Sequence, residues 1–317
     1  MSSLVISLDL ELFWGVTDSK TIDSYGKNIL GVYDAVPAIL ELFEKYGIRA
    51  TWATVGMLMC KDHDQWRAMS PEIVPQYCRD SLSTYNFSEL AKAYPKYFFG
   101  KALIEQILAL NGQELASHSY SHFYVGESSA SLEAFEQDIE CTHRIFGEYG
   151  VCPTSFVFPR NQVNPVLLAT LAKHGFTAYR GNQDGCLYRS GSTGSNGKFA
   201  RIARIVDDYL PVTRDFISDT MREAQYGQMV NIPATRFLRP SKLPLVSDRF
   251  VRNRVKRGMR QAALEGKNYH LWWHPHNFGI RLNENISKLE DILKYYKVLS
   301  EQYRFTSNSM SDLAVQT

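Results

Sequence analysis

The stretch V-Y-D-A-V-P-A-I-L-E-L-F-E-K-Y-G-I-R-A-T-W-A-T-V, residues 32–55, joins a helical pattern directly to a strand pattern. Apolar residues recur at helical spacing over residues 32–46, and Gly47 then offers the left-handed conformation in which helices commonly end. Residues 49–55 are β-branched and aromatic, which favours a strand. Residues 4–8 form another apolar, β-branched run, so residues 4–55 predict a β-α-β unit.

The same alternation continues along the chain. Further strands are expected at residues 113–117, 154–158, 176–179, 229–232 and 269–273, with helices over residues 132–146, 165–174 and 286–299. Seven candidate strands without a change of composition predict one α/β domain over residues 1–317, a single distorted (β/α)7 barrel. Two stretches predict long strand-to-helix loops: residues 57–99 are rich in aromatic residues, and residues 182–199 in Gly and Ser.

The composition is that of a globular protein. The 317 residues are 44% hydrophobic and 21% charged, with 20 Gly and 12 Pro, which excludes collagen-like, disordered and disulfide-stapled chains. With 35 basic and 33 acidic residues the formal charge is +2, so net charge gives no reason to expect a nucleic-acid partner. Five scattered cysteines, the lack of a secretory signal and the lack of a long apolar run predict a soluble protein of the cytoplasm.

The most specific motif is E-L-A-S-H-S-Y-S-H, residues 114–122, in which His118 and His122 follow a predicted strand. One helical turn would bring two histidines of this spacing to one face, and imidazole is a favoured ligand of Zn²⁺ and similar ions. The alternative is a pair of polar loop histidines without a shared function. The choice between them depends on what the other strands carry at their ends.

Two further polar clusters end predicted strands. Asp9 and Glu11 lie on one side of the first strand by its two-residue period, and two acids there are costly to bury unless a metal or another cation pairs with them. The alternative is that one of these two acids caps the structural element that follows the strand. His274 and His276 end the strand at residues 269–273. Because parallel strands of a barrel end on one rim, the three clusters predict one metal-binding site. No role is expected for His63, His143 or His174.

These motifs, in this order, resemble the NodB-homology polysaccharide deacetylases, carbohydrate esterase family 4. The resemblance rests on S-L-D-L-E (residues 7–11), A-T-W-A-T-V-G (50–56), H-S-x-x-H (118–122), F-V-F-P-R-N (156–161) and L-x-x-H (271–274). It implies a distorted seven-stranded barrel that removes an N- or O-acyl group from a sugar with the help of a divalent metal ion. Zn²⁺ is the expected ion, with Co²⁺, Fe²⁺ or Ni²⁺ as alternatives.

The resemblance also implies roles for individual residues. His118 and His122 match the metal-binding histidines, and Asp9 matches the catalytic base. The family has a second aspartate where this chain has Leu10, so we assign the third ligand to Glu11, while an exchange of roles between Asp9 and Glu11 stays open.

The remaining catalytic and substrate contacts are assigned in the same way. His274 matches the general acid, with His276 as the second candidate. Arg160 is the candidate for the arginine that orients the catalytic aspartate. Leu271, Trp273 and His276 are expected to contact the substrate.

The expected substrate is an N-acetylated sugar or a surface-polysaccharide precursor carried on a lipid or a nucleotide. A cyclic-amide or formamide hydrolase on the same barrel and a non-catalytic sugar-binding protein are the alternatives. Residues 249–267 are strongly basic with apolar residues at helical spacing. This segment predicts a barrel helix with a solvated face, or a surface that binds a phosphate-linked substrate or rests against an anionic membrane.

Overall fold

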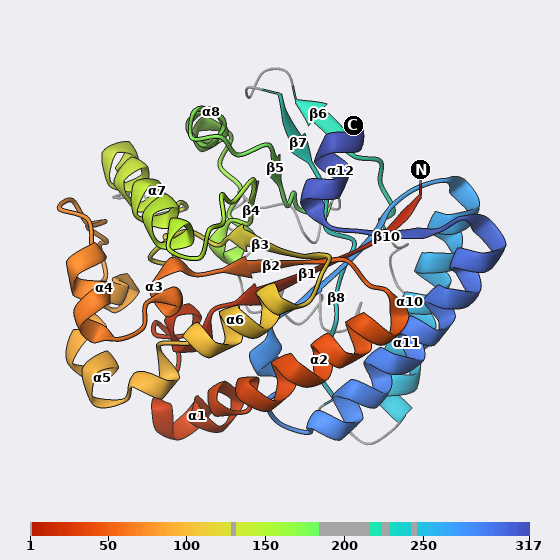
Figure 1. Ribbon diagram of the computed structural model, residues 1–317, viewed down its shortest axis with the longest axis horizontal. Helices are drawn as coiled ribbons and strands as arrows, with labels where there is room; N and C mark the ends of the chain where they lie inside the picture. The colour runs from red at the N-terminus through yellow and green to blue at the C-terminus, as the bar shows by residue number, and fades with distance from the viewer. Residues whose placement is uncertain (1, 128–130, 184–215, 224–227, 242–245) are drawn as a thin grey trace.

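A curled, mostly parallel sheet forms the centre of the computed structural model, which describes residues 2–127, 131–183, 216–223, 228–241 and 246–317 (Figure 1). Its strands are β1 (Ser3–Leu10), β2 (Ala50–Thr54), β3 (Gln113–Ser117), β4 (Ser155–Phe156), β5 (Ala178–Tyr179), β6 (Met221–Glu223), β7 (Met229–Asn231), β8 (Arg236–Phe237), β9 (Tyr269–Trp273) and β10 (Thr306–Asn308). They follow the order β6-β7-β5-β4-β3-β2-β1-β9-β8, while β10 pairs with the first residues of β1.

One bent segment closes the barrel. The backbone N–H of Ala234 donates to the carbonyl oxygen of Gly181, just after β5, at 2.9 Å, and the next N–H, of Thr235, donates to His270 of β9 at 2.8 Å. The chain from β7 to β8 therefore passes from one end of the parallel part of the sheet to the other. When this segment, which contains β7 and β8, is counted as one strand, it makes seven parallel strands together with β1 to β5 and β9. This arrangement confirms the α/β barrel fold.

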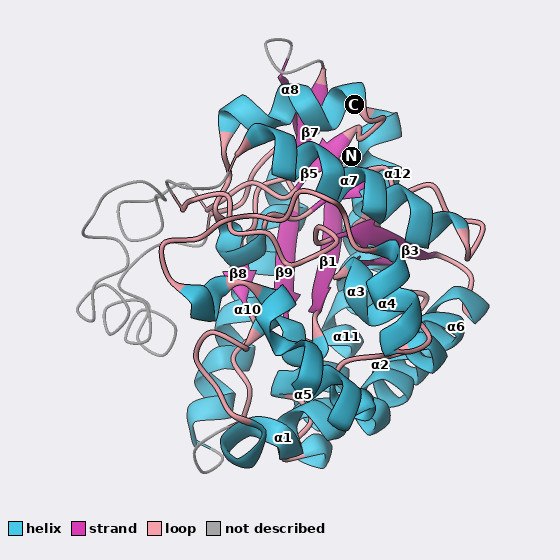
Figure 2. Ribbon diagram, turned by 90° about the vertical axis from the view of Figure 1, so that its left-hand side faces the viewer, coloured by secondary structure: helices cyan, strands magenta, loops and turns pink. Residues whose placement is uncertain are grey.

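Helices surround the sheet on its outer side. They are α1 (Ile22–Leu30), α2 (Val32–Tyr46), α3 (Gly56–Met59), α4 (His63–Met69), α5 (Ser88–Ala93), α6 (Lys101–Ala109), α7 (Leu132–Gly147), α8 (Pro165–Lys173), α10 (Val246–Glu265), α11 (Leu282–Tyr303) and α12 (Met310–Gln316). Short 3-10 turns cover residues 12–15, 80–82, 84–87, 95–97, 159–161 and 275–277. In Figure 2, α1, α3, α4 and α5, which follow the carboxyl ends of β1 and β2, lie in front of the strands.

The two faces of β1 show how the strands divide the core. Leu4, Ile6 and Leu8 pack with the helices in the large outer cluster, whereas Val5 belongs to a separate cluster inside the barrel. This alternation follows from the two-residue period of an extended chain. It sends Asp9, on the same side as Val5, into the barrel.

Several element boundaries match the sequence patterns. The strands at residues 113–117 and 269–273 and the helix at residues 32–46 have the expected bounds, and Gly47 ends that helix with φ 63°. The long connection at residues 57–99 contains three short helices. Most of the expected loop at residues 182–199 lies outside the described residues. None of the described helices combines the length and the apolar character needed to span a bilayer.

Candidate active site

Glu11 lies at the centre of a buried polar cluster, one residue beyond the end of β1. Its Oε1 is 3.1 Å from His118 Nε2 and 3.3 Å from His122 Nε2, and all three side chains are buried. One ligand atom from each residue lies within 4.8 Å of the other two. Burial favours the protonated form of Glu11, but the charge of the nearby His274, with smaller contributions from His118 and His122, outweighs it and holds the pKa of this carboxyl well below its usual range.

The chemistry of these three residues fits a divalent metal ion. His118 Nδ1 lies 2.8 Å from the carbonyl oxygen of Val157, which can only accept a hydrogen bond, so Nδ1 carries the proton. This tautomer leaves the lone pair of Nε2 directed at Glu11. Burial also lowers the pKa of His122 and keeps this imidazole neutral. Two imidazoles and one carboxylate form a donor set found in catalytic zinc sites.

The segment that carries both histidines is an irregular turn, so the expected helical turn is wrong. Ser119 and His122 have φ of 60° and 56°, values that no α-helix contains. Local hydrogen bonds fix the turn: Ser117 Oγ accepts from Ser119 N at 3.0 Å, and Ser119 Oγ accepts from Phe123 N at 2.7 Å. The two imidazole rings nevertheless lie 5.2 Å apart, close enough to share one ion.

Asp138 of α7 holds the same turn by hydrogen bonds, a role that the sequence analysis did not predict. Its carboxylate accepts hydrogen bonds from Tyr120 N at 2.7 Å, from Ser121 N at 2.9 Å and from the Ser121 hydroxyl. Burial raises the pKa of Asp138 to about 6 despite these donors. An acid on the apolar face of an amphipathic helix was the available signal.

Arg180, and not Arg160, holds Asp9. Its two terminal nitrogens donate to the two carboxylate oxygens of Asp9 at 2.6 and 2.7 Å, and both side chains are buried. Burial favours the protonated form of Asp9, but the guanidinium outweighs it and lowers the pKa of this carboxyl. Arg160 was the expected partner. It is one-third exposed and pairs instead with Asp18, because residues 159–161 turn its side chain toward the rim.

A chain of buried polar groups continues behind Arg180. Its Nη1 donates to Ser7 Oγ at 3.0 Å, and Ser7 Oγ lies 2.8 Å from His270 Nε2. His270 Nδ1 lies 3.2 Å from the carbonyl oxygen of Ile232, so Nδ1 carries the proton and Nε2 accepts from Ser7. Asn161 accepts a further hydrogen bond from Arg180 at 2.8 Å. Arg180 is therefore fixed on three sides, with its charge directed at Asp9.

His274 lies on the other side of the carboxylates. Its Nε2 is 3.6 Å from Glu11 Oε1 and 3.8 Å from Asp9 Oδ2, and 23% of its side chain is exposed. Removal from water opposes protonation, but Glu11 and Asp9 outweigh it and raise the pKa of His274. His276 stacks on the His274 ring at 4.9 Å and is buried, and burial lowers its pKa to about 3. A neutral, buried His276 is poorly placed to contact a substrate or donate a proton.

Leu271 and Trp273 do not face the site, so the expectation that they contact the substrate is wrong. Both are completely buried in the outer cluster, and Trp273 stacks on Phe278. The two-residue period of β9 directs the residue between them, Trp272, into the barrel instead. Trp272 is partly exposed, lies 5.7 Å from His274, and receives the Arg180 guanidinium on its face at 4.4 Å.

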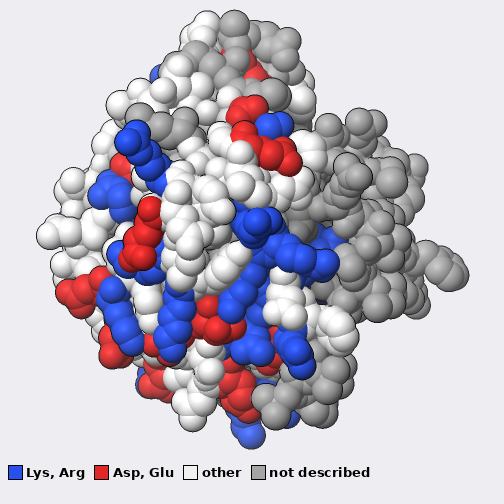
Figure 3. Space-filling model, turned by 90° about the vertical axis from the view of Figure 1, so that its right-hand side faces the viewer, with Lys and Arg blue, Asp and Glu red and all other residues white. Residues whose placement is uncertain are grey.

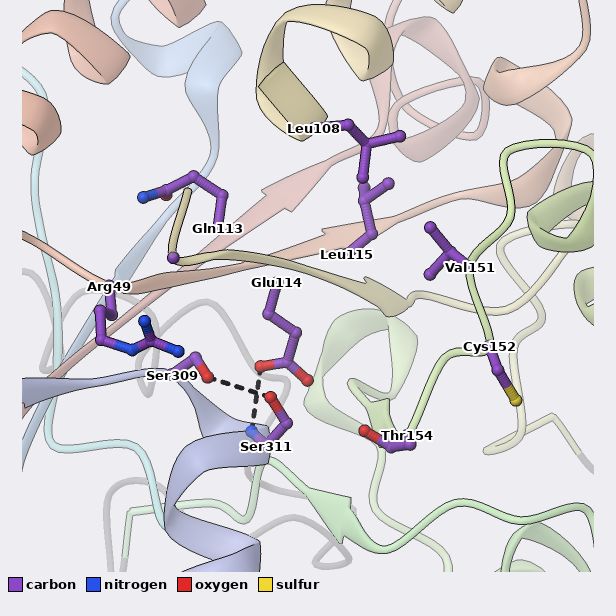
Figure 4. Close-up of a pocket in the computed structure, with 11 residues that line it drawn as sticks. Arg49, Leu108, Gln113, Glu114, Leu115, Val151, Cys152, Thr154, Ser309 and Ser311 are labelled. Carbon is purple, nitrogen blue, oxygen red and sulfur yellow. Dashed lines mark hydrogen bonds between the residues drawn. The ribbon is translucent and has the colours of Figure 1, made fainter. Parts of the chain in front are cut away.

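Other polar residues of the expected motifs lie elsewhere. Glu114 begins the strand that ends before His118, and it faces a separate hollow of about 310 Å³ at the amino ends of the strands (Figure 4). There its carboxylate accepts hydrogen bonds from Thr51 Oγ1 and Ser311 N. His143 stacks against His174, with the ring centroids 6.2 Å apart.

Comparisons with known proteins give a family-model match and solved structures of the same fold. Residues 26–179 match the family model for polysaccharide deacetylases. Three solved structures, each 14% identical, align over 99% of this chain and 89% of their own: proteins from Mycobacterium smegmatis (TM-score 0.64) and Pseudomonas aeruginosa PAO1 (0.56), both described as polysaccharide deacetylases, and the Puue allantoinase (0.55). At this identity the likeness shows a shared fold. No curated protein sequence matches the chain.

Proposed function

We propose that this chain, whose residues 26–179 match the family model for polysaccharide deacetylases, is a metal-dependent hydrolase that removes an N-acetyl group from a sugar. The observation that carries the proposal is the convergence of Glu11, His118 and His122, with Asp9 and His274 on either side of them. We propose Zn²⁺ as the ion these three residues hold, since their donor set suits it. A divalent ion would supply Lewis-acid chemistry, acidifying a water molecule and polarising the acyl carbonyl.

The residues of the chain divide the proton transfers between them. Asp9, ionised and fixed by Arg180, is placed to accept the proton that water loses as its oxygen attacks the acyl carbon. His274, whose pKa is raised, is placed to donate a proton to the sugar nitrogen as the carbon–nitrogen bond breaks. Acetic acid and the amino sugar are the products, and the reaction leaves Asp9 protonated and His274 neutral.

We propose for Trp272 the substrate contact that the sequence analysis expected of Leu271 and Trp273. Its ring is the apolar surface beside His274, and Phe237 of β8 packs edge-on against it at 4.7 Å. We propose that the methyl group of the acyl substituent packs against Trp272. A small apolar surface between a base and an acid favours a short acyl chain.

Metal analysis coupled to product analysis tests the proposal. Purified protein is expected to contain one divalent ion per chain and to release acetate from N-acetylated sugars, as measured by mass spectrometry. His118→Ala is expected to lose both the ion and the activity. The matched control is His174→Ala, a histidine on the outer helices that is expected to keep both. Loss of the ion without loss of activity would refute the proposal.

Formyl and cyclic amides belong in the same assay, because the residues that would open them are the same. Turnover of these compounds alone would favour the alternative hydrolase, and metal binding without any turnover would favour the sugar-binding alternative. The lipid- or nucleotide-linked precursor and the cytoplasmic location stay predictions, which cell fractionation and substrate extraction can test.

A further inference from the structure

Helix α10 forms one wall of a surface groove of about 570 Å³ on the outside of the barrel. Its lining includes Phe250, Arg254, Lys256, Arg257 and Arg260 of α10 and Tyr295 of α11. Figure 3 shows this side of the molecule, where Lys and Arg side chains gather around the middle of the view. The groove is formed by none of the residues that surround the candidate metal ligands.

The cations of the groove differ in how their charge is balanced. Lys256 Nζ lies 2.8 Å from Asp291 Oδ2, so an acid of α11 neutralises it. No acidic side chain in the described ranges lies within 4.0 Å of Arg257 or Arg260. These two arginines are exposed and three residues apart, so their guanidinium groups lie on the same face of the helix. Two adjacent guanidinium groups without acids suit the oxygens of a phosphate or a diphosphate.

Aromatic surface accompanies this charge. Phe250 is 53% exposed, and Tyr295, on the opposite wall, lies 5.7 Å below the ammonium group of Lys256. Phe250 and Arg257 are seven residues apart, two helical turns along one face. A groove of this volume falls within the range of small-molecule sites and exceeds what an inorganic phosphate would fill. The ligand that fits therefore carries an organic body beside its anionic group.

We propose that this groove binds a phosphate ester, with its phosphate or diphosphate on Arg257 and Arg260 and its apolar or aromatic body against Phe250 and Tyr295. Two sources offer this chemistry, a soluble nucleoside diphosphate and a phospholipid. Neither depends on the metal site, so the groove can bind its ligand whether or not the chain deacetylates a sugar.

Binding titrations of the full chain test the groove with four probes. These are inorganic pyrophosphate, uridine diphosphate, vesicles of phosphatidylcholine, and vesicles of phosphatidylcholine mixed with phosphatidylglycerol. Uridine diphosphate or the mixed vesicles are expected to bind, with affinity that falls as the salt concentration rises. Binding of uridine diphosphate identifies a soluble ligand, and binding of the mixed vesicles alone identifies a lipid.

Two variants of equal charge separate the groove from general attraction. The double variant Arg257→Glu with Arg260→Glu is expected to bind at least roughly tenfold more weakly. The control, Lys92→Glu with Lys173→Glu, changes the net charge equally at exposed positions of α5 and α8, and is expected to stay within about twofold. Thermal unfolding of both proteins confirms that each remains folded.

Phe250→Ala tests the organic body of the ligand. It is expected to weaken binding of uridine diphosphate or of the mixed vesicles severalfold, and to leave the weaker binding of pyrophosphate unchanged. Equal losses in the groove variant and the charge-matched control would overturn the proposal, since the attraction would then be a property of net charge. Failure of every probe to bind would overturn it as well.

Discussion

Replacing Arg180 by methionine would remove the guanidinium that holds Asp9 and keep a long side chain in its place. The two side chains are 0% and 3% exposed, and Arg180 makes four hydrogen bonds through its terminal nitrogens, two of them to Asp9. Removing one partner of a buried ion pair costs about 3–5 kcal/mol, because the other charge stays buried without compensation. We expect Arg180→Met to lower the free energy of unfolding by this amount at neutral pH.

The pH dependence of this loss follows from the pKa of Asp9. In the native protein this pKa lies below its ordinary value of 3.8, so the ion pair stabilises the fold above that pH and is lost as the pH falls through the folded pKa. In the variant, burial acts without the guanidinium and raises the pKa of Asp9. Asp9 then takes up a proton on acidification, and the difference in unfolding free energy between the two proteins shrinks as the pH falls towards about 4.

Urea unfolding, followed by the fluorescence of the five tryptophans, measures these free energies. A double-mutant cycle with Asp9→Asn isolates the coupling between the two side chains, which we expect to exceed about 2 kcal/mol. Arg160→Met is the control: its ion pair with Asp18 is one-third exposed and contributes at most about 1 kcal/mol. Additivity of the Arg180 and Asp9 changes to within about 0.5 kcal/mol would refute the reasoning.

Three further changes address the rest of the site. Gly15→Ala would place a Cβ 1.9 Å from Glu11 Oε2, so we expect the metal content measured by elemental analysis to fall sharply. The control is Gly147→Ala, whose Cβ meets nothing within 4 Å and which should keep its metal. Equal metal content in the two variants would contradict the ligand role of Glu11. Ser7→Ala removes one hydrogen bond from the guanidinium that orients the base, and we expect roughly tenfold slower turnover at unchanged metal content, with unchanged turnover as the contrary result. Asp138→Asn removes a buried acid whose pKa is raised to about 6. As the pH rises from about 4 to about 6, the free energy of unfolding of the native protein should therefore fall by about 3 kcal/mol relative to that of the variant. Unfolding free energies that change in parallel over this range would count against the prediction.

Local sequence patterns predicted much of the barrel, because the spacing of apolar residues follows from which side chains of a strand or helix are buried. The strands at residues 113–117 and 269–273 are each followed directly by a histidine, and both are central strands with neighbours on each side. The strands β8 and β10 are two and three residues long and carry no apolar run of their own, so only their partners define them. Short strands fixed by tertiary pairing lie beyond what a local pattern can predict.

The candidate site divides in a similar way. Asp9, Glu11, His118, His122 and His274 were predicted from their places after strands, and the structure brings them together. Arg180 directly follows the strand expected at residues 176–179, but the resemblance directed the assignment of the orienting arginine to Arg160. The errors at Leu271 and Trp273 come from assigning both to the substrate without the two-residue period of β9. This period turns Leu271 and Trp273 to the outer side of the sheet and Trp272 to the inner side.

The pairing of β1 has a consequence for how the chain acquires its site during synthesis. Ser7 to Leu10 pair with β2 soon after they are made, but two later strands, β9 on the opposite edge of β1 and β10 beside its first residues, lie more than 260 residues further along the sequence. When His122 leaves the ribosome, Glu11 and both histidines already exist, yet the strand that buries Asp9 and supplies His274 does not. Contacts at such separation form late. A nascent chain can therefore bind a metal ion before the pocket around the ligands has formed. A chain stalled on the ribosome before residue 270 would expose the three ligands beside an unpaired edge of β1. In that state, binding of a wrong metal ion and aggregation through the unpaired strand edge compete with folding.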